Sequence, residues 1–489
     1  MLHMADFTIY QGTTHSYITI RPSDPFGPFV RSFTQGVLAE HEFVPRIRRV
    51  ITTRKYSDYD VKTSRLYIPV EYTSYLVDHI TSAGLTVDIV PIVPIEGRDI
   101  KLKINRKWKD KDYQTPAIEY LARDTAPRRG LQFQPGKGKT YCAIRAIVEL
   151  GKTAIVIVPG LVEQWEHSFK EITNVGSKLY VIRGFKSILA LTQCNFKPDI
   201  LLCSIDTVRA YIKFEDNYQT LPYNFSQFLD HYGVGTKVMD EVHLNFHALT
   251  MIDLNANVKN NIYLTATFTS ANRDTRKIFN VVFPDTMRYG AMDYERYVNV
   301  TIYRYYGEVL ERKVIKAKGY SHARYEGEIL KKESKFLRYM DEVIRPLIDS
   351  HYINLRNPGE KCLLFFSTLE MVHHVKKYLD RVYPKLIINE YIGGVDDDAL
   401  DKVDIILTTP KSAGCGTDIK MLRTAINTIS ELSPTSVEQK RGRLRKLPNG
   451  VTPEYVDIFD GNIVRHCEHI KSRSLIHKNR CLSYKEYTI

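Results

Sequence analysis

The sequence predicts an α/β protein with two tandem parallel-sheet domains, preceded by a small α+β region. From about residue 106 to the end, short strands rich in Val, Ile and Leu alternate with helical segments. These strands lack the strict apolar–polar alternation of a half-exposed sheet, which is typical of parallel sheets covered on both faces. The first hundred residues instead mix short β-like runs with one helix-like stretch. We therefore expect three regions, 1–105, 106–287 and 288–489.

The first region combines strand-like and helix-like patterns. Runs of β-branched and aromatic residues predict strands, and apolar residues at helical spacing predict a helix. The expected strands are residues 16–20, 66–69 and 86–94, and the expected helix is residues 71–83. A basic run, KLKINRKWKDKD at residues 101–112, leads into the second region.

The second and third regions repeat one pattern, a short buried strand followed by a helical segment. This repetition predicts two similar parallel sheets. In the second region the expected strands are residues 154–158, 200–203, 237–239 and 261–264. In the third region they are residues 361–366, 386–391, 404–407, 425–429 and 455–458. The charged segment 307–334 has helical character but no assigned role.

Composition limits the class of protein. The 489 residues include 69 Lys and Arg against 56 Asp and Glu, a net charge of +13. This excess favours polyanionic partners, because each neutralised phosphate releases counterions, although a merely basic soluble protein is the alternative. Seven cysteines without CxxC spacing argue against a zinc ribbon or a disulfide framework, so we expect a reducing, cytoplasmic setting. A signal-peptide pattern and a long apolar run are both missing from the sequence, so no membrane partner is expected.

The most informative segment is GLQFQPGKGKT, residues 130–140. Gly136 and Gly138 would let backbone N–H groups surround a phosphate, and the following helical segment adds its positive N-terminal end. Lys139 is expected to reach the β- and γ-phosphates of a nucleotide, and the Thr140 hydroxyl to bind Mg²⁺. The strict GxxxxGK[ST] pattern fails because residue 133 is Phe. Taken alone, a GKT triplet also fits an ordinary loop.

About one hundred residues later, an apolar strand ends in the acidic sequence DEVH, residues 240–243. Hydrolysis of a phosphate anhydride needs a carboxylate that holds Mg²⁺ and a second group that orients water. We expect Asp240 to bind the metal and Glu241 to orient the water, because α/β sheets bind ligands at the carboxyl ends of their strands. Considered alone, the pair also fits a solvated acidic turn.

In this order, the segments resemble the motifs of superfamily 2 helicases of the DExH type over about residues 108–475. Gln114 falls at the family's adenine-contacting glutamine, although Lys111 stands where the family has Arg. The glycine loop matches motif I, with Phe133 in place of a small residue. Asp240, Glu241 and His243 match motif II. Further matches are residues 157–165 for motif Ia, with Leu161, Gln164 and Trp165, residues 203–207 for motif Ic, and residues 264–267 for motif III.

The third region continues the motif order. Residues 364–367 resemble motif IV, and Gly416 and Asp418 follow two threonines as in motif V. Gln439 and Arg443 match the opening of motif VI, Q-x-x-G-R, which gives Arg443 the role of arginine finger. The family's second arginine falls on Lys446, with Arg445 one residue early, and the choice matters because Lys lacks the planar guanidinium. The resemblance places Gly416, Asp418, Gln439 and Arg445 among the nucleotide contacts.

The resemblance implies two RecA-like domains that hydrolyse ATP, with Mg²⁺, while they move along nucleic acid. The first domain would supply Gln114 and motifs I and II, and the second would supply Arg443. Nucleic acid would be held mainly through its phosphates. Hydroxyl-bearing candidates for these contacts are Ser204, Thr207, Ser367 and Thr408. We expect a monomer.

The residues of motifs I, Ia and II resemble those of the DNA-repair branch of this superfamily. Within that branch they are most similar to phage UvsW-type and RecG-like branch-migration and fork-remodelling helicases. This implies a phage-encoded DNA helicase that acts on forked or junction DNA in replication, recombination or repair, in the host cytoplasm. Residues 1–105 would then be a DNA-engaging accessory domain or a structural cap on the first motor domain.

Two other functions stay open: a DExH RNA helicase, and a degenerate helicase that only binds nucleic acid. The motor subunit of a restriction system is disfavoured, because we find no nuclease-like cluster of carboxylates with lysine outside the motor. Residues 466–469, His-Cys-Glu-His, fit no closed metal site and are expected in a C-terminal helix packed on the last domain.

Overall fold

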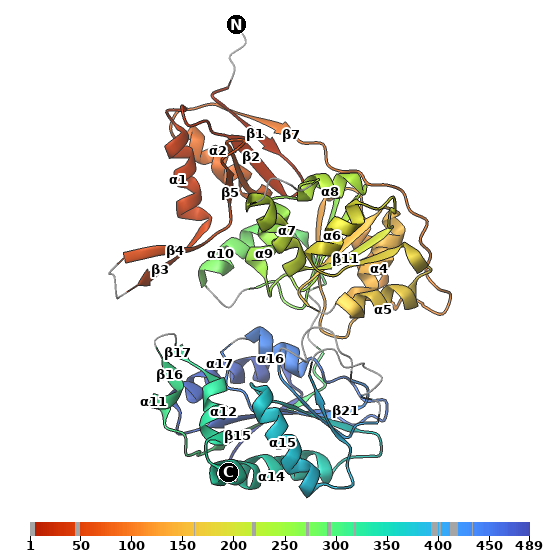
Figure 1. Ribbon diagram of the computed structural model, residues 1–489, viewed down its shortest axis with the longest axis vertical. Helices are drawn as coiled ribbons and strands as arrows, with labels where there is room; N and C mark the ends of the chain where they lie inside the picture. Colours follow the sequence, from red (N-terminus) through yellow and green to blue (C-terminus); the bar gives the residue numbers. More distant parts are fainter. Residues whose placement is uncertain are drawn as a thin grey trace. The chain divides into compact units, whose positions relative to one another are not determined.

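In the computed structural model the chain forms two compact units, Met1–Met292 and Asp293–Ile489 (Figure 1). Each unit is built around a seven-stranded sheet whose strands are all parallel. The predicted fold class, two tandem RecA-like sheets with a small N-terminal α+β region, is therefore confirmed. The structure describes residues 5–44, 49–160, 162–217, 222–269, 273–290, 295–316, 319–392, 400, 402–410, 419–432 and 434–489.

The N-terminal region has a five-stranded sheet of order β5-β6-β2-β1-β7, antiparallel except for the β1–β7 pair. Its strands are β1 (Phe7–Gln11), β2 (His15–Thr19), β5 (Asp58–Asp60), β6 (Arg65–Pro69) and β7 (Val87–Pro91). Its helices are α1 (Gly27–Val37) and α2 (Thr73–Thr81), and β3 (Ala39–Val44) pairs with β4 (Arg49–Lys55) in a hairpin. Because side chains alternate across a strand, Ile9, Ile18 and Leu66 pack inward with the two helices, and their neighbours face outward.

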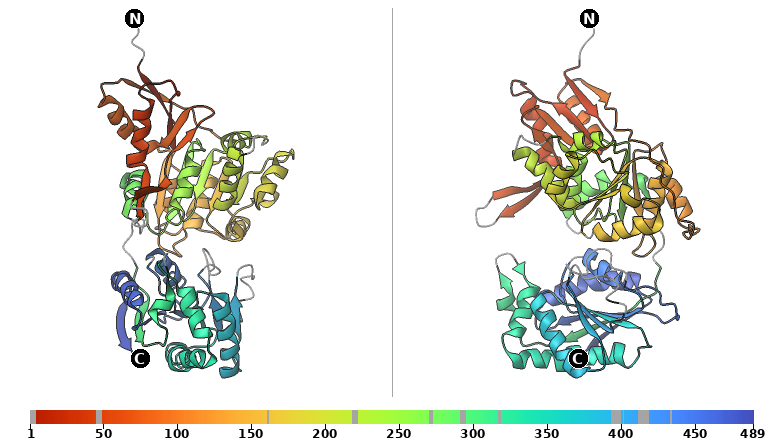
Figure 2. Two further views of the ribbon diagram at one scale, coloured as in Figure 1. Left: turned by 60° about the vertical axis from the view of Figure 1, so that its left-hand side comes forward. Right: turned by 45° about the vertical axis from the view of Figure 1, so that its right-hand side comes forward.

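The first seven-stranded sheet has the order β10-β11-β9-β12-β13-β8-β14. Its strands are β8 (Arg128–Gln132), β9 (Ala154–Val158), β10 (Leu179–Ile182), β11 (Ile200–Ser204), β12 (Thr236–Met239), β13 (Asn260–Thr265) and β14 (Arg288–Tyr289). Its helices are α3 (Thr115–Leu121), α4 (Lys139–Leu150), α5 (Val162–Ile172), α6 (Phe185–Thr192), α7 (Ile205–Asn217), α8 (Phe225–His231), α9 (Phe246–Asp253) and α10 (Arg273–Val282). Along β9, Ile155 and Ile157 join one core cluster, while Ala154, Val156 and Val158 join another, so the sheet is covered on both faces (Figure 2).

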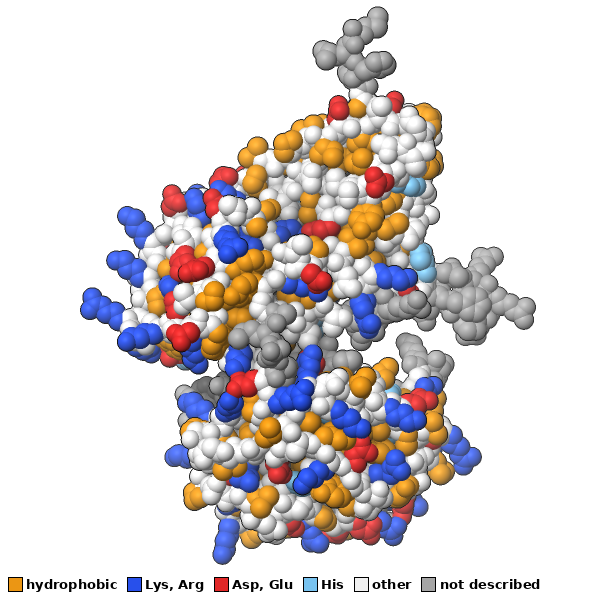
Figure 3. All heavy atoms as spheres, turned by 180° about the vertical axis from the view of Figure 1, so that it is seen from behind, with side chains coloured by type: hydrophobic (Ala, Val, Ile, Leu, Met, Phe, Trp, Pro, Cys, Tyr) orange, Lys and Arg blue, Asp and Glu red, His pale blue; other side chains and the backbone are white. Residues whose placement is uncertain are grey.

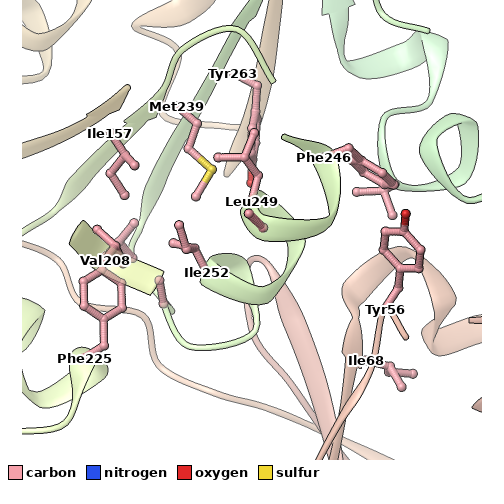
Figure 4. Packing of buried hydrophobic residues seen from close by; sticks show 14 of the residues in the cluster. Tyr56, Ile68, Ile157, Val208, Phe225, Met239, Phe246, Leu249, Ile252 and Tyr263 are labelled. Carbon is pink, nitrogen blue, oxygen red and sulfur yellow. The ribbon is translucent and has the colours of Figure 1, made fainter. Parts of the chain in front are cut away.

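The N-terminal region packs directly against this sheet's helices. One apolar cluster includes Ile68 and Tyr56 together with residues of the first seven-stranded sheet and its helices, and the Tyr56 and Phe246 rings lie 5.2 Å apart (Figure 4). Asn257 Oδ1 accepts hydrogen bonds from the backbone N–H and the hydroxyl of Thr13, at 2.8 and 3.0 Å. The N-terminal region and the first seven-stranded sheet with its helices therefore share one hydrophobic core.

The second unit has a sheet of order β19-β20-β18-β21-β22-β15-β23. Its strands are β15 (Asn299–Tyr305), β18 (Lys361–Phe365), β19 (Ile388–Tyr391), β20 (Ile405–Thr408), β21 (Leu422–Asn427), β22 (Glu454–Asp460) and β23 (Ser483–Thr488). Its helices are α11 (Glu311–Val314), α12 (His322–Leu330), α13 (Glu333–Tyr339), α14 (Arg345–Ile348), α15 (Leu369–Val382), α16 (Pro434–Arg441) and α17 (Val464–Arg480). The charged segment 307–334 contains α11, a short hairpin of β16 (Ile315–Lys316) and β17 (Gly319–Tyr320), and α12.

Most predicted strands lie within two residues of the observed ones. The largest shift in the second unit is the strand predicted at 425–429, which is β21 at Leu422–Asn427. The strand β8 was not predicted, because two arginines in it conceal a buried segment. Arg129 is fully buried there and donates a hydrogen bond to Asn260 Oδ1 at 2.6 Å. Within the described ranges, no helix is long and apolar enough to cross a membrane.

Candidate functional site

The glycine loop lies at the carboxyl edge of the first parallel sheet, between β8 and α4. Gly136 and Gly138 have φ values of 80° and 82°, in the left-handed region that glycine adopts without strain. Gly138 is the residue before the first turn of α4, which begins at Lys139 and continues with the half-buried Thr140. A Cβ atom on Gly138 would lie 2.4 Å from Gln114 Nε2, so a larger residue at this position would have to displace the buried glutamine amide.

Phe133 departs from the usual motif, yet its side chain does not fill the loop. It is 1% exposed and belongs to the apolar cluster under the sheet, where its ring meets Tyr113 edge to face. Its carbonyl oxygen accepts a hydrogen bond from Lys139 Nζ at 3.3 Å. With Phe133 at this position, the interior of the loop is still lined by backbone groups. This argues against the alternative that the loop is degenerate.

The acidic pair lies at the carboxyl end of β12, two strands from β8 in the same sheet. Lys139 Nζ is 3.6 Å from Glu241 Oε1, so loop and acidic pair meet. Glu241 has a φ of 47°, an uncommon conformation for a residue with a side chain, which costs about 1–3 kcal/mol. Such backbone strain persists where the surrounding structure fixes the direction of the side chain. Here the Glu241 side chain is directed toward Lys139.

Burial and the adjacent charge of Glu241 raise the pKa of Asp240 to about 6, while Lys139 and the hydrogen bond from Trp165 act in the opposite direction. Its two carboxylate oxygens accept hydrogen bonds from Glu241 N and from Trp165 Nε1, both at 2.9 Å. Since a raised pKa reports a carboxylate charge that the protein leaves under-compensated, a bound cation would stabilise this site. The donor set of two carboxylates and the Thr140 hydroxyl fits Mg²⁺, which prefers oxygen ligands.

His243, the last motif II residue, faces the end of β13. Its Nδ1 lies 2.6 Å from Thr265 Oγ1 and 3.4 Å from Glu241 Oε2. Because the Thr265 hydroxyl donates to the Thr267 carbonyl, His243 Nδ1 must be the donor in its bond to Thr265. Burial lowers the pKa of His243, so the ring is neutral at pH 7. The histidine thus links the acidic pair to the residues predicted as motif III.

Gln114 lies next to the glycine loop. It is 5% exposed, its Oε1 accepts from Lys111 N at 3.0 Å, and its Nε2 donates to the Lys137 carbonyl at 3.3 Å. The side-chain amide therefore connects the start of α3 to the loop. Lys111, which replaces the family's Arg, contributes its backbone to this arrangement.

In the second unit, the residues predicted as motif VI lie in the last turn of α16 and directly after it. Arg443 is 8% exposed, and Lys440 and Arg441 are more deeply buried. Lys440 Nζ donates to Asn427 Oδ1 at 2.8 Å and pairs with Glu431. Gln439, by contrast, is only half-buried in the last turn of α16.

The two candidates for the second cation have different environments. Arg445 bends back onto the carbonyl oxygens of Gly442 and Leu444. Lys446 is exposed and pairs with Glu295. Both contacts lie within the second unit.

The motif V predictions Gly416 and Asp418 lie outside the described residues, as does Leu161 of motif Ia. The prediction that the Thr408 hydroxyl contacts nucleic acid is wrong for this structure. Thr408 is fully buried, and its Oγ1 donates to the Tyr391 carbonyl at 2.8 Å, because it ends a central strand. Ser204 and Thr207 hydroxyls lie at the sheet's carboxyl edge, 2.9 Å from each other.

Sequence reasoning missed Glu326, whose carboxylate binds the turn predicted as motif IV. Glu326 on α12 accepts hydrogen bonds from Ser367 N and Thr368 Oγ1, both at 2.6 Å. Burial raises the pKa of Glu326 to about 7. No pattern near Glu326 marks this role, because its partners are more than forty residues away.

The cluster at residues 466–469 lies in α17, on the second sheet as predicted. His466 is buried, with Nδ1 accepting from Asp460 N at 3.1 Å and Nε2 against the Tyr320 hydroxyl. Both ring nitrogens are therefore used inside the fold. Over the part of the chain that the structure describes, no group of three or more His, Cys, Asp or Glu side chains could hold a metal ion.

Two seven-stranded parallel sheets, with a glycine loop and an acidic pair at the carboxyl edge of the first, define the fold of a helicase-type ATPase. Residues 107–270 match the protein-family model described as "Type III restriction enzyme, res subunit". Over these residues the family match agrees with the resemblance seen in the motifs, and the two solved structures with a TM-score of 0.50 share the fold.

A search of solved structures found these similarities. S. cerevisiae Dbp5 bound to RNA and ADP BeF3 is 14% identical, with a TM-score of 0.50, over 78% of this chain and 90% of that chain. The ATP-dependent Type ISP restriction-modification enzyme LlaBIII bound to DNA is 14% identical, with a TM-score of 0.50, over 85% of this chain and 34% of that one. T4 UvsW is 17% identical over 99% of both chains, with a TM-score of 0.36. A comparison with curated proteins found no match.

Proposed function

We propose that this protein is an ATP-dependent DNA helicase or translocase that unwinds or branch-migrates forked or junction DNA. The observation that carries the proposal is the meeting of the glycine loop with the acidic pair: Lys139 Nζ lies 3.6 Å from Glu241 Oε1, next to Asp240. A cation on a phosphate-type loop opposite two carboxylates is what hydrolysis of a nucleotide with Mg²⁺ requires.

In this proposal, each candidate site residue of the first domain has a defined role. Backbone N–H groups at Gly136 and Gly138, with Lys139, bind the phosphates, and Gln114 contacts the adenine. Thr140 and Asp240 hold Mg²⁺, which when bound neutralises phosphate charge. Glu241 orients the attacking water, and His243 relays the state of this site to Thr265.

The second domain supplies the remaining groups. Arg443 acts as the arginine finger, and Gln439, Gly416 and Asp418 contribute nucleotide contacts. Arg445 is the better candidate for the second cation, because its guanidinium can make a planar, bidentate contact that an ammonium cannot. It would exchange its contacts with the Gly442 and Leu444 carbonyls for the nucleotide.

The preference for DNA rests on the motif resemblance, since the superfamily 2 fold occurs both in Dbp5 bound to RNA and in LlaBIII bound to DNA. ATP turnover measured with forks, four-way junctions, plain duplexes and RNA duplexes at stated salt distinguishes these substrates. The strongest stimulation by forks or junctions is expected. Stimulation by RNA alone would replace the proposal with a DExH RNA helicase. Binding should weaken steeply with salt, because phosphate contacts dominate.

An ATPase assay of Lys139→Ala and Glu241→Gln tests the site. Both variants should lose turnover by about a hundredfold or more, since each removes a group that acts on the reacting phosphate. Lys152→Ala and Glu96→Gln are matched controls, because both residues form exposed ion pairs elsewhere in the same unit. Near-wild-type turnover in both site variants would exclude the assigned site.

A further inference from the structure

A groove of about 760 Å³ runs between the outer face of the N-terminal sheet and the first motor domain. One wall comes from strands β2, β5 and β6 and includes Tyr17, Arg65 and Tyr67. The opposite wall comes from α8 and the loop after α9, and includes Gln227 and Asn255. Cavities of this size hold small organic groups rather than a protein chain or a duplex.

Tyrosines form a row across the outer face of the N-terminal sheet. Tyr10 pairs with Tyr17, and Tyr17 pairs with Tyr67, in adjacent antiparallel strands. The rings of Tyr10 and Tyr17 are stacked with centroids 4.9 Å apart, and Tyr17 and Tyr67 lie 5.4 Å apart. The inward neighbours of these residues already supply the apolar contacts to α1 and α2. The row is therefore aromatic surface that the core does not require.

Arg65 extends the row with a second kind of flat surface. Its guanidinium lies over the Tyr17 ring, 4.5 Å from the centroid. Arginine planes and tyrosine rings are the surfaces on which unpaired bases stack in nucleic-acid-binding proteins. On the opposite wall, Gln227 Oε1 caps α8 and Asn255 Nδ2 donates to the Met251 carbonyl, which leaves Gln227 Nε2 and Asn255 Oδ1 as a donor and an acceptor of the kind that base edges use.

The charges in the groove indicate which part of a nucleic acid fits. Two cations, Lys62 and Arg65, share it with three carboxylates, Asp58, Asp60 and Asp230. Asp60 is occupied within its own turn, where it accepts from Lys62 N at 2.8 Å and from Thr63 Oγ1. Without a cationic excess, the groove suits uncharged bases better than a run of phosphates. On the face drawn in Figure 3, the N-terminal end of the first unit likewise carries mainly hydrophobic and uncharged side chains.

We propose that this groove binds unpaired bases of the nucleic acid on which the motor acts, by stacking on the Tyr67 ring and on the Arg65 guanidinium, which the Tyr17 ring supports. The proposal rests on the proposed function, since a motor that opens a duplex produces unpaired bases next to itself. It makes residues 1–105 part of the nucleic-acid interface, in addition to their packing on the first motor domain.

Binding of fluorescently labelled oligonucleotides tests the groove. The double variant Tyr17→Ala/Tyr67→Ala should bind an oligo(dT) single strand about tenfold or more weakly, because it removes the Tyr67 ring and the Tyr17 ring that supports Arg65. Its affinity for a blunt duplex should stay within about twofold of the wild type. Tyr17→Phe/Tyr67→Phe keeps both rings and should bind like the wild type. Tyr75→Ala is the matched control, because Tyr75 is 50% exposed on α2 and lies outside the groove.

Photocrosslinking of the wild-type protein to a single strand that contains 5-iodouracil gives an independent readout, which does not depend on how the alanine variant folds. Crosslinks mapped by mass spectrometry should fall on Tyr10, Tyr17 or Tyr67. Wild-type affinity in the alanine variant, or crosslinks confined to other regions, would overturn the groove while leaving the motor proposal intact. A wild-type protein whose ATP turnover no nucleic acid stimulates would instead refute the proposed function.

Discussion

Trp165 Nε1 donates a hydrogen bond to Asp240 Oδ2 at 2.9 Å, and so connects α5 to the carboxyl end of β12. Trp165 is 2% exposed, so the indole cannot turn away without leaving a cavity. The other oxygen of Asp240 accepts from Glu241 N, which holds the carboxylate from two sides. Groups that orient a metal ligand in this way set its affinity for the ion. Trp165 is therefore a positioning residue for the proposed Mg²⁺ ligand.

Trp165→Phe removes the donor and keeps most of the buried volume. We expect the Mg²⁺ concentration that gives half-maximal nucleotide binding to rise about tenfold, as for other losses of a residue that orients a metal ligand. Mg²⁺ titrations of a fluorescent nucleotide measure this without reference to turnover. Trp108→Phe is the matched control, because Trp108 stacks on Tyr141 and is the only other tryptophan. An unchanged Mg²⁺ dependence in Trp165→Phe would contradict the positioning role.

The raised pKa of Asp240, about 6, predicts that protons compete with Mg²⁺. As the pH falls below 6, the carboxyl becomes neutral, so Mg²⁺ affinity should fall by up to about tenfold per pH unit. Calorimetric titrations between pH 5 and pH 8 measure the dependence. Asp240→Asn should bind Mg²⁺ weakly at every pH. Wild-type affinity that stays constant down to pH 5 would show that Asp240 is not the ligand.

The same pKa has a consequence for stability. Because the pKa of Asp240 is higher in the folded state than its ordinary value of 3.8, the folded protein is favoured below pH 4 and loses this contribution as the pH rises through 6. In the absence of Mg²⁺, Asp240→Asn should therefore raise the free energy of unfolding at pH 8 by about 1–3 kcal/mol. Urea denaturation should show a smaller gain at pH 5. An equal effect at both pH values would mean that lost hydrogen bonds, not charge, decide the result.

Gly138→Ala tests how closely Gln114 packs on the glycine loop. A Cβ there would lie 2.4 Å from Gln114 Nε2, so the loop or the amide must move, and nucleotide affinity should fall at least about tenfold. Gly84→Ala is a matched control: Gly84 has φ of 79°, but a Cβ meets nothing within 4 Å. It should cost about 1 kcal/mol of stability and leave nucleotide affinity unchanged. Equal nucleotide affinities in the two variants would refute the close packing.

Asn257 joins the N-terminal region to the first motor domain. Its Oδ1 accepts two bonds from Thr13, and its Nδ2 donates to the Val93 carbonyl at 3.3 Å. Asn257→Ala should lower the free energy of unfolding by about 1–3 kcal/mol, because it leaves polar groups of Thr13 unsatisfied. Asn255→Ala, which loses only a bond to Met251 O one turn earlier, should cost less. Hydrogen exchange should show β1, β2 and β9 opening together; independent opening of β1 would contradict a shared core.

The parts of the fold that could be predicted from sequence are those whose signal is local. The runs at 154–158 and 200–203 are apolar throughout, and burial on both faces of a sheet requires this pattern. The glycine loop and the DEVH sequence are each recognised from a continuous stretch of residues. Each lies at the end of a strand. Strand β8 was not predicted, because an arginine such as Arg129 is normally expected on the surface. Its burial depends on a hydrogen bond to Asn260, which lies far along the chain.

The rest of the site depends on contacts between distant segments. Trp165 meets Asp240 across 75 positions in sequence, and Glu326 meets Ser367 across 41. Motif order marked Trp165 as part of motif Ia, but not as a hydrogen-bond donor to Asp240. Thr408 shows the opposite error, since a hydroxyl beside a motif pattern is satisfied inside the sheet.

The apolar cluster that joins Ile68 and Tyr56 to the first motor sheet limits how this protein can be rearranged. A shortened chain that begins at residue 106 would expose half of a core to water, and such surfaces aggregate. Residues 1–105 therefore cannot be transferred to another protein as an independent domain, because part of their core belongs to the first seven-stranded sheet. Insertions and deletions near residue 105 are therefore expected to destabilise the first unit.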